Sequence, residues 1–470
     1  MTQLARGDIR EEKVVDVRID DYGFRGEGYV RLDDGWLSVS GAIPGELVRV
    51  RLQPGQREGA RRLFADVVEV LEAAPERRDP LCERDQICRG CQLRHLTVDT
   101  ELRFKVRTIR EVIERYAGLP EAEQPEIDVV TPQPIARGDA FRIRSRLSYR
   151  RRGDEFSLGL HTPVREQLIS MERCPALTKP LQRLVKVISS SLEQCDRLPD
   201  AAEDDGATTG PGVAGVRVVS PTHGVGLVEV ELAGTDDEEQ FLGAVQEERL
   251  EPWLTRLAAT VPEQVGLAVS SGEFRHIVKE PSRIRVPIGK WEMEIGYDDW
   301  FHATLRPAEQ VYSKMMDWLD IRSDERLVDI GCGTGTITLM TAERATEVVG
   351  IDINSSSIEA AEINAVGHGR ENVEFVVGGW EKALRQLAMR EERFSVATIN
   401  PMREPLGYRP LAFLERLGVE RLVYLGPSPE AAAKDIGELR QMGWSVERLA
   451  AGNLHPATYH TLLMALVVRD

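Results

Sequence analysis

Apolar and polar residues follow different periods in successive stretches of the chain. From residue 13 to residue 71 they alternate in short runs, and turn-forming sequences such as DDG, IPGE and QPGQ separate the runs. A period of two residues is typical of half-buried β-strands. Short strands at this even spacing predict a small all-β barrel at the N-terminus.

The last third of the chain has a different pattern. From about residue 308 onward, helical patterns alternate with apolar runs of strand length. The runs are RLVDIG, EVVGID, VEFVV, FSVATIN, RLVYLG and TLLMALVV. Alternation of this kind is typical of a doubly wound, Rossmann-like α/β domain.

The middle of the chain mixes helices and strands. A helical pattern covers about residues 98–116, and the strand-like stretches FRIRSRLSYRR and FSLGLHT precede a helix near residues 179–194. The tract AAEDDGATTGPG that follows is predicted to be an acidic flexible loop. These patterns predict a central α+β domain.

A chain of 470 residues is too long for one hydrophobic core. We therefore predict a multidomain protein, with a small OB-like β-barrel at residues 1–72, the α+β domain at 73–298 and the α/β domain at 299–470. No apolar run approaches the roughly 20 residues of a membrane span, and the first residues lack the apolar stretch of a signal peptide. We expect a cytoplasmic protein without membrane segments.

The charge balance argues against a broadly basic surface. The chain has 60 basic and 77 acidic residues, which gives a formal charge of -17. Only nine of the basic residues are lysines, so nearly all of the positive charge is arginine. Arginine pairs bidentately with phosphate and stacks on bases, so local contact with nucleic acid stays possible.

A glycine-rich segment, LVDIGCGTGTITL, lies at the exit of the first predicted strand of the α/β domain. It places Asp329, Gly331, Gly333 and Gly335 at a strand-to-helix turn, where glycine lets the backbone approach a ligand. Asp352 ends the next strand, where a carboxylate can accept hydrogen bonds from ribose hydroxyls. The combination resembles class I S-adenosylmethionine (SAM) methyltransferases more than dinucleotide enzymes, and it predicts a SAM site.

Four of the six cysteines form a candidate ligand set. Cys82, Cys88 and Cys91 have the spacing C-x5-C-x2-C, and Cys174 lies far downstream, directly before a proline. Clustered cysteines without a secretion signal favour metal or cluster binding over disulfides. The five-residue gap fits poorly with paired zinc knuckles, so we predict a [4Fe-4S] cluster, with zinc or unliganded thiols as alternatives.

The strand-like stretch FRIRSRLSYRRR carries six arginines. Alternation along a strand would place Arg142, Arg144 and Arg146 on one face, where such a row can follow a phosphate backbone. The alternative is a solvated face of the sheet.

The order of these parts resembles the iron-sulfur RNA uracil-5-methyltransferase family over almost the whole chain. The resemblance implies that residues 13–71 form a TRAM module that grips RNA, although a spacer barrel is the alternative. It also implies that the four cysteines hold the cluster and that Asn400 lies at the cofactor site with the residues of the glycine-rich turn. Structured RNA, either rRNA or tRNA, is the implied partner, and no obligate protein partner is evident.

The chain departs from that family where the uracil chemistry takes place. The family adds a cysteine thiolate to carbon 6 of uracil, methylates carbon 5 and then removes the carbon-5 proton with a glutamate. The nucleophile position corresponds to Pro427 and the base position to Leu462. In the family's FxQxN segment Ala303 and Leu305 replace the polar residues, and Asn400 replaces an aspartate. The catalytic residues are therefore unknown.

Other side chains offer no clear replacement for the missing groups. Cys332 lies inside the SAM turn, and Cys195 has no base pattern near it. His302, His455 and His460 lie near the expected pocket, but such histidines are more often packed or at the surface.

We predict a SAM-dependent RNA methyltransferase. One alternative is a catalytically inactive RNA-binding paralogue. Another is a methyltransferase that acts on a different base atom without a cysteine nucleophile, since Asn400-Pro401 partly resembles the Asn-Pro-Pro-aromatic turn of enzymes that methylate exocyclic amines. Met402 and Arg403 depart from that turn.

Overall fold

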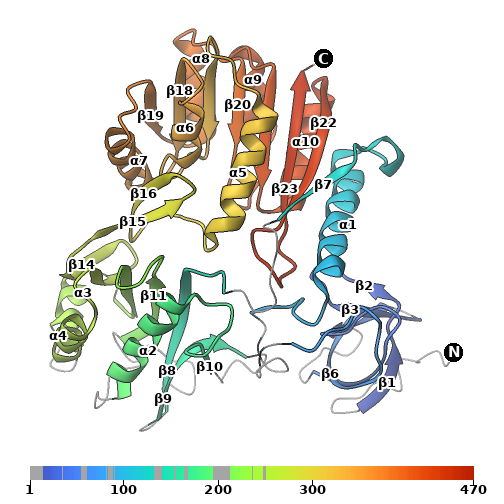
Figure 1. The fold of residues 1–470 in the computed structure, drawn as a ribbon, viewed down its shortest axis with the longest axis vertical. Helices are drawn as coiled ribbons and strands as arrows, with labels where there is room; N and C mark the ends of the chain where they lie inside the picture. Colours follow the sequence, from blue (N-terminus) through green and yellow to red (C-terminus); the bar gives the residue numbers. More distant parts are fainter. Residues whose placement is uncertain are drawn as a thin grey trace.

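The computed structural model has an α/β architecture with mixed sheets. It describes residues 14–33, 35–53, 61–80, 82, 88, 90–131, 140–152, 155–162, 168–193, 212–235, 237–246 and 250–469. Within these ranges the chain forms four sheets. In Figure 1 the C-terminal sheet lies above the central domain and the N-terminal sheet. Apart from Gly212, the acidic tract predicted as a flexible loop lies outside the described residues.

The N-terminal segment forms a six-stranded sheet with its own apolar core. Its strands are β1 (Val14–Arg18), β2 (Asp21–Tyr22), β3 (Gly28–Leu32), β4 (Gly35–Ser40), β5 (Leu47–Leu52) and β6 (Arg62–Glu72). They follow the order β1-β5-β6-β4-β3-β2. Leu37, Val39, Val48 and Val50 alternate with polar residues and are fully buried, as the period of two predicts. Closure of this sheet into a barrel stays a prediction.

The central domain is built on a seven-stranded sheet in the order β10-β9-β8-β11-β12-β13-β14. Its elements are β8 (Arg144–Arg152), β9 (Glu155–His161), β10 (Leu168–Ser170), α2 (Lys179–Glu193), β11 (Gly212–Val219), β12 (Gly226–Ala233), α3 (Glu238–Val245), α4 (Leu250–Thr260), β13 (Val265–Ser271) and β14 (Phe274–Lys279). Leucines of α2 and α4 share one core with the valines of β11 to β13. The hairpin β15 (Arg283–Ile288) and β16 (Trp291–Gly296) leads from this domain to the C-terminal sheet.

The C-terminal sheet has eight strands in the order β19-β18-β17-β20-β21-β23-β22-β7. Its elements are β7 (Ile127–Val130), α5 (Leu305–Leu319), β17 (Arg326–Ile330), α6 (Thr336–Thr341), β18 (Glu347–Asp352), α7 (Ser355–Gly367), β19 (Val373–Val377), α8 (Trp380–Met389), β20 (Val396–Ile399), α9 (Tyr408–Arg416), β21 (Arg421–Gly426), α10 (Pro429–Gln441), β22 (Trp444–Gly452) and β23 (Leu462–Arg469). Strands β17 to β21 run parallel, and β23 is antiparallel to its neighbours. The predicted α/β architecture is confirmed.

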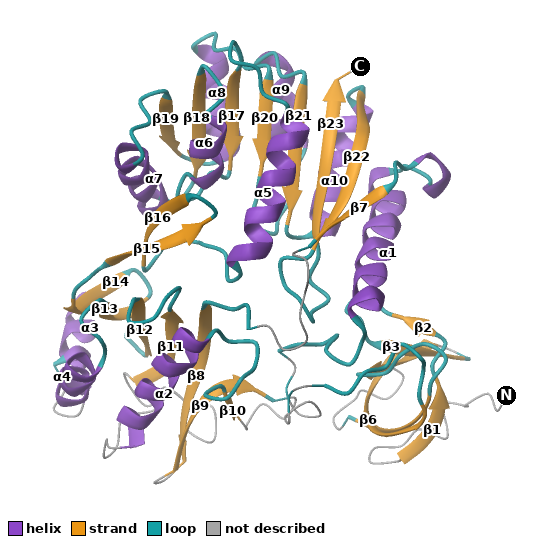
Figure 2. Cartoon of the chain, viewed as in Figure 1, coloured by secondary structure: helices purple, strands orange, loops and turns teal. Residues whose placement is uncertain are grey.

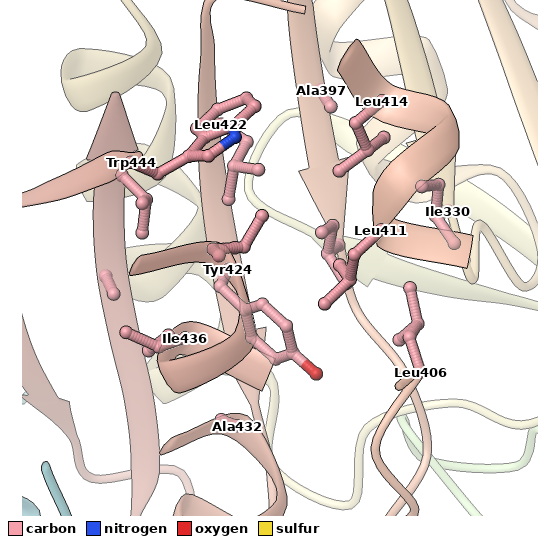
Figure 3. Close-up of a cluster of buried hydrophobic side chains, with 14 of the residues drawn as sticks. Ile330, Ala397, Leu406, Leu411, Leu414, Leu422, Tyr424, Ala432, Ile436 and Trp444 are labelled. Carbon is pink, nitrogen blue, oxygen red and sulfur yellow. The ribbon is translucent and has the colours of Figure 1, made fainter. Parts of the chain in front are cut away.

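Helices cover both faces of this sheet (Figure 2). On one face, side chains of α9 and α10, including Leu411, Leu414 and Ile436, pack against Leu422 and Tyr424 of β21, as Figure 3 shows. The other face packs against α5 and the β15–β16 hairpin. Burial on both faces explains why these strands are continuous apolar runs.

Residues 98–130 lie in the central segment of the sequence but pack on the C-terminal sheet. Helix α1 (Val98–Ala117), followed by the short helix η2 (Glu121–Glu123), packs against α10 and β22. Gly437 allows the close approach, because a Cβ there would lie 2.7 Å from the carbonyl oxygen of Tyr116. Strand β7 then pairs in parallel with β22.

A buried carboxylate joins three elements of the C-terminal domain. Asp329 at the end of β17 has no exposed surface. Its two oxygens accept hydrogen bonds of 2.7 Å from the hydroxyls of Thr338 in α6 and Thr398 in β20. Burial raises the pKa of Asp329 to about 6, against the two hydrogen bonds that lower it.

This pKa gives a pH-dependent stability that Asp329→Asn should remove. The folded pKa lies above the usual value near 3.8, so the folded state holds the proton more tightly than the unfolded state does. The contribution of Asp329 to the free energy of unfolding therefore falls as pH rises from about 4 to about 6, by on the order of 3 kcal/mol. Denaturant unfolding at several pH values measures this difference between the two proteins. If the free energies of unfolding of the two proteins changed with pH in the same way, the raised pKa of Asp329 would be contradicted.

Candidate active site

The predicted SAM turn lies where the parallel strands end. The carboxyl ends of β17, β18, β20 and β21 share one edge of the sheet, which is where open α/β sheets bind ligands. The chain leaves β17 at Ile330 and starts α6 at Thr336, so the glycine-rich turn spans this edge. The sequence prediction of a strand-turn-helix unit is confirmed.

Each glycine of the turn has a positive φ that favours glycine. The φ angles are +81° at Gly331, +53° at Gly333 and +84° at Gly335. A Cβ at Gly331 would lie 2.3 Å from the carbonyl oxygen of Asn400, so no side chain fits there. The turn therefore packs directly on the loop that follows β20.

The two predicted acidic residues serve this turn in different ways. Asp352 at the end of β18 is half-buried, and its carboxylate accepts hydrogen bonds of 2.9 Å from the backbone N–H groups of Gly333 and Asn354. It stands beside the turn at the edge of the sheet. Asp329 lies beneath the turn with both oxygens engaged. Direct contact of either residue with SAM stays a prediction.

The positions predicted for the family's nucleophile and base lie side by side. Gly426 of β21 pairs with Leu463 of β23, so Pro427 and Leu462 adjoin that pair. Pro427 leads into α10, whose N-cap is Ser428, and Leu462 is only 4% exposed. The topology brings the two positions together, yet neither side chain can act as nucleophile or base.

Asp435 of α10 fixes the far end of the loop after β20, a role that the sequence analysis missed. Its buried carboxylate accepts hydrogen bonds from the N–H groups of Leu406 (2.7 Å) and Gly407 (2.9 Å) and from the Tyr424 hydroxyl (2.6 Å). Figure 3 shows the Tyr424 hydroxyl on the side of Leu406. Burial raises the pKa of Asp435 above its usual value.

A buried ion pair on α1 fixes the loop between β22 and β23. Lys105 donates to Glu101 (2.9 Å), to the side-chain oxygen of Asn453 (2.5 Å) and to the carbonyl of His455 (3.1 Å). Glu101 also accepts from the N–H of Ala457 at 2.9 Å. A charged i,i+4 pair on the apolar face of an amphipathic helix is the sequence signal that was missed.

Three histidines lie near this loop. His302 is buried and shares a hydrogen bond with the hydroxyl of Tyr312. The rings of His455 and His460 lie 5.9 Å apart. The pKa values of all three are lowered, mainly by burial. The pKa is about 4 for His302 and His460 and about 3 for His455. All three are therefore neutral at physiological pH.

The four predicted ligand cysteines are half-buried free thiols that interact electrostatically. Burial raises the pKa of Cys91 to about 12, and the other three thiols contribute to this rise. In the described part of the chain, no three His, Cys, Asp or Glu residues are grouped closely enough to hold a metal ion. The donor set suits an iron-sulfur cluster chemically, while the described geometry does not form its ligand cage. Cys195 lies outside the described residues.

The three arginines predicted to contact RNA have different partners. Arg142 donates to the carbonyl of Gly90 at 3.4 Å, close to the cysteine segment. Arg144 is largely buried and donates to the carbonyl of Phe301 at 2.9 Å. Arg146 is exposed and pairs with Glu231 at 2.7 Å. Their contact with RNA stays a prediction.

Asp352→Ala tests the assignment of the SAM site. We expect SAM affinity to fall about tenfold or more, because a carboxylate that accepts hydrogen bonds contributes about 1.5–3 kcal/mol. Isothermal titration calorimetry on the full chain measures it, with a thermal melt to show that the variant is folded. A folded variant with unchanged affinity would refute the assignment.

Comparison with known proteins agrees with this geometry. A family profile described as a methyltransferase domain matches residues 321–422, which hold the glycine-rich turn and strands β17 to β20. No helix in the described part of the chain is long and apolar enough to cross a membrane.

Relatives match along almost the entire chain. A 23S rRNA (uracil(1939)-C(5))-methyltransferase RlmD from Pseudomonas aeruginosa is 26% identical over 91% of this chain and 88% of its own length. An uncharacterised RNA methyltransferase from Thermosynechococcus vestitus is also 26% identical, over 96% and 97%.

A solved structure shares the fold. The tRNA (uracil-54, C5)-methyltransferase of Pyrococcus abyssi, solved with S-adenosyl-L-homocysteine, superposes with a TM-score of 0.68 at 19% identity over 96% of this chain and 99% of its own. The chain is thus similar along almost its whole length to proteins named as RNA methyltransferases, and it shares the fold of a tRNA uracil-5-methyltransferase.

Proposed function

We propose that the protein transfers a methyl group from SAM to a base of structured RNA. The observation that carries the proposal is the glycine-rich turn at the edge of the parallel sheet, packed on the Asn400 carbonyl and bonded to Asp352. Helix N-termini and close backbone approach at such an edge suit a nucleoside ligand. Relatives named as RNA methyltransferases over the same length support RNA as the acceptor.

We propose rRNA or tRNA as the class of substrate, with the N-terminal sheet as a TRAM-like RNA-binding module. Trp36 and Phe64 are 51% and 41% exposed on adjacent parallel strands of that sheet. The guanidinium of Arg62 lies over the Phe64 ring, 5.1 Å from its centroid. Exposed rings beside arginine offer stacking surfaces and phosphate contacts to single-stranded RNA.

We also propose that Cys82, Cys88, Cys91 and Cys174 hold a [4Fe-4S] cluster, with zinc as the alternative. Four thiols from two distant segments influence one another electrostatically, which supports a shared site. Bound there, the cluster would tie the cysteine segment to the turn that contains Cys174. The residues of the proposed methyl-transfer site belong to other elements, so we assign the cluster no step of the reaction.

A non-catalytic RNA-binding protein is the second candidate function. The observation in its favour is that Pro427 and Leu462 occupy the two adjoining positions where the family resemblance places nucleophile and base.

Methyl transfer is tested directly on RNA from a strain that lacks the gene. Purified full-length protein is incubated anaerobically with that RNA and isotope-labelled SAM, and the nucleosides are analysed by mass spectrometry. We expect a labelled methylated nucleoside, and Asp352→Ala serves as the matched variant with reduced labelling. Binding of SAM and RNA without label would refute catalysis and favour the RNA-binding function.

The cluster proposal predicts that Cys88→Ser loses iron. The proposed cluster needs four thiolates and its binding stabilises the fold, so we expect the iron content and the visible absorption to fall and the thermal stability of the central domain to decrease. Cys332→Ser, outside the ligand set, is the control and should keep its iron. Colourless wild-type protein that contains zinc would refute the iron-sulfur assignment.

A further inference from the structure

The thiols of the methyltransferase region are unsuited to methylation of a pyrimidine carbon. Carbon 5 becomes nucleophilic only after a thiolate or similar group adds at carbon 6. Within residues 299–469, the described part of this region, the one cysteine is Cys332. Its buried thiol donates to the Gly333 carbonyl, and burial together with Asp329 and Asp352 raises its pKa well above the usual value. The thiol stays protonated and engaged.

We propose that the methyl acceptor is a nitrogen of an RNA base, and that the imidazole of His460 takes up the proton which this nitrogen loses. This inference rests on the proposed methyl transfer and specifies its acceptor. A nitrogen lone pair attacks SAM directly and needs no covalent intermediate on the protein.

Strand register places His460 at the edge of the sheet that carries the SAM turn. It lies two residues before Leu462, next to the pair formed by Leu463 and Gly426. Strand β20, which pairs with β21, ends at the same edge of the sheet. It continues into Asn400, whose carbonyl packs against Gly331. Arg403, three residues further along this loop, acts electrostatically on His460. His460 therefore lies opposite the loop that packs on the predicted cofactor turn.

The surroundings of His460 keep its ring neutral and available. The positive groups that act on it are Arg403 from the β20 loop, Arg142 from the segment before β8 and Lys105 from α1. Its ring packs against Tyr459, 4.2 Å between centroids, and lies near His455. Within the described residues, its ring nitrogens take part in no hydrogen bond, although its backbone N–H donates to Thr458. A neutral imidazole can accept a proton.

The loop that presents His460 is fixed from several sides. In addition to the contacts of Lys105 and Glu101, the N–H of Leu93 donates to the Ala457 carbonyl at 2.9 Å, and the N–H of Asn453 donates to Val130 at 2.8 Å. Ala457 has a φ of +60°, which is unfavourable for a residue with a Cβ. A strained and multiply anchored backbone at the ligand-binding edge of a sheet is typical of a site built for a fixed geometry.

The step is balanced without any further reactant. The lone pair of the base nitrogen forms a bond to the methyl carbon, the carbon–sulfur bond of SAM breaks, and its electron pair remains on sulfur to give S-adenosylhomocysteine. The nitrogen becomes positively charged and strongly acidic, and its proton passes to His460. Asn400 offers a side-chain carbonyl oxygen at the same edge as an acceptor for an N–H of an amino group.

The identity of the methylated nucleoside decides the acceptor. With wild-type protein, labelled SAM and RNA from the deletion strain, we expect label in an N-methylated nucleoside. Label in 5-methyluridine would overturn the nitrogen acceptor while methyl transfer itself stands. Absence of label in any nucleoside would overturn both proposals.

His460→Ala tests the proton acceptor, with His276→Ala on the exposed face of β14 as the matched control. We expect kcat to fall about 100-fold with unchanged SAM affinity, partial recovery with added imidazole, and wild-type activity in the control. Activity of His460→Ala within a few-fold of wild type, or a loss that imidazole does not restore, would overturn the role of His460. If His460→Ala does not fold, His460→Gln, which keeps most of the side-chain volume, is measured in its place by the same criteria.

Discussion

The buried carboxylate of Asp329 is the interaction on which the C-terminal domain depends. Its hydrogen bonds with Thr338 and Thr398 tie the end of β17 to α6 and to β20. A fully buried carboxylate without these partners would be costly, so the two hydrogen bonds favour this packing of the three elements. The turn above it packs with Gly331 directly against the carbonyl of Asn400. The SAM turn and the loop after β20 consequently form one unit.

Local patterns in the sequence were sufficient to predict strands β17 to β21 and β23 of this domain and the place of its turn, but β22 was not predicted. They were insufficient to assign every element to its sheet, because α1 and β7 have ordinary helix and strand patterns and nothing in the pattern shows that β7 pairs with β22. The hydrogen bonds that anchor the loops of the site could not be predicted from the sequence either. Lys105 and Asn453 are 348 residues apart in sequence, and Asp435 bonds to backbone groups that carry no sequence signal. Such contacts exist only once the fold is formed.

Arginine content overstated the positive charge that is available to RNA. Arg146 pairs with Glu231, Arg217 pairs with Glu229 and Glu231, and Arg275 pairs with Glu229. Alternating arginines on β8 cannot reveal the glutamates of β12, which lies two strands away in the sheet. An exposed ion pair such as Arg146–Glu231 contributes only about 0–1 kcal/mol, so a phosphate can compete for Arg146 at small cost. The paired arginines thus limit nonspecific attraction without preventing local contact.

The buried Lys105–Glu101 pair is relevant to whether the candidate active site is catalytic. Buried ion pairs add little stability over well-packed apolar residues, because desolvation offsets their attraction. What this pair contributes is position: its hydrogen bonds reach Asn453, His455 and Ala457 in the loop that ends at His460. A scaffold that only bound RNA through its N-terminal sheet would not need that loop anchored so firmly at the edge of the sheet that carries the SAM turn. Pro427 and Leu462 supply no reactive group. The fixed placement of His460 is therefore the feature of this edge of the sheet that suits catalysis of methyl transfer. A base nitrogen, which needs only the removal of a proton, is the methyl acceptor that His460 can serve.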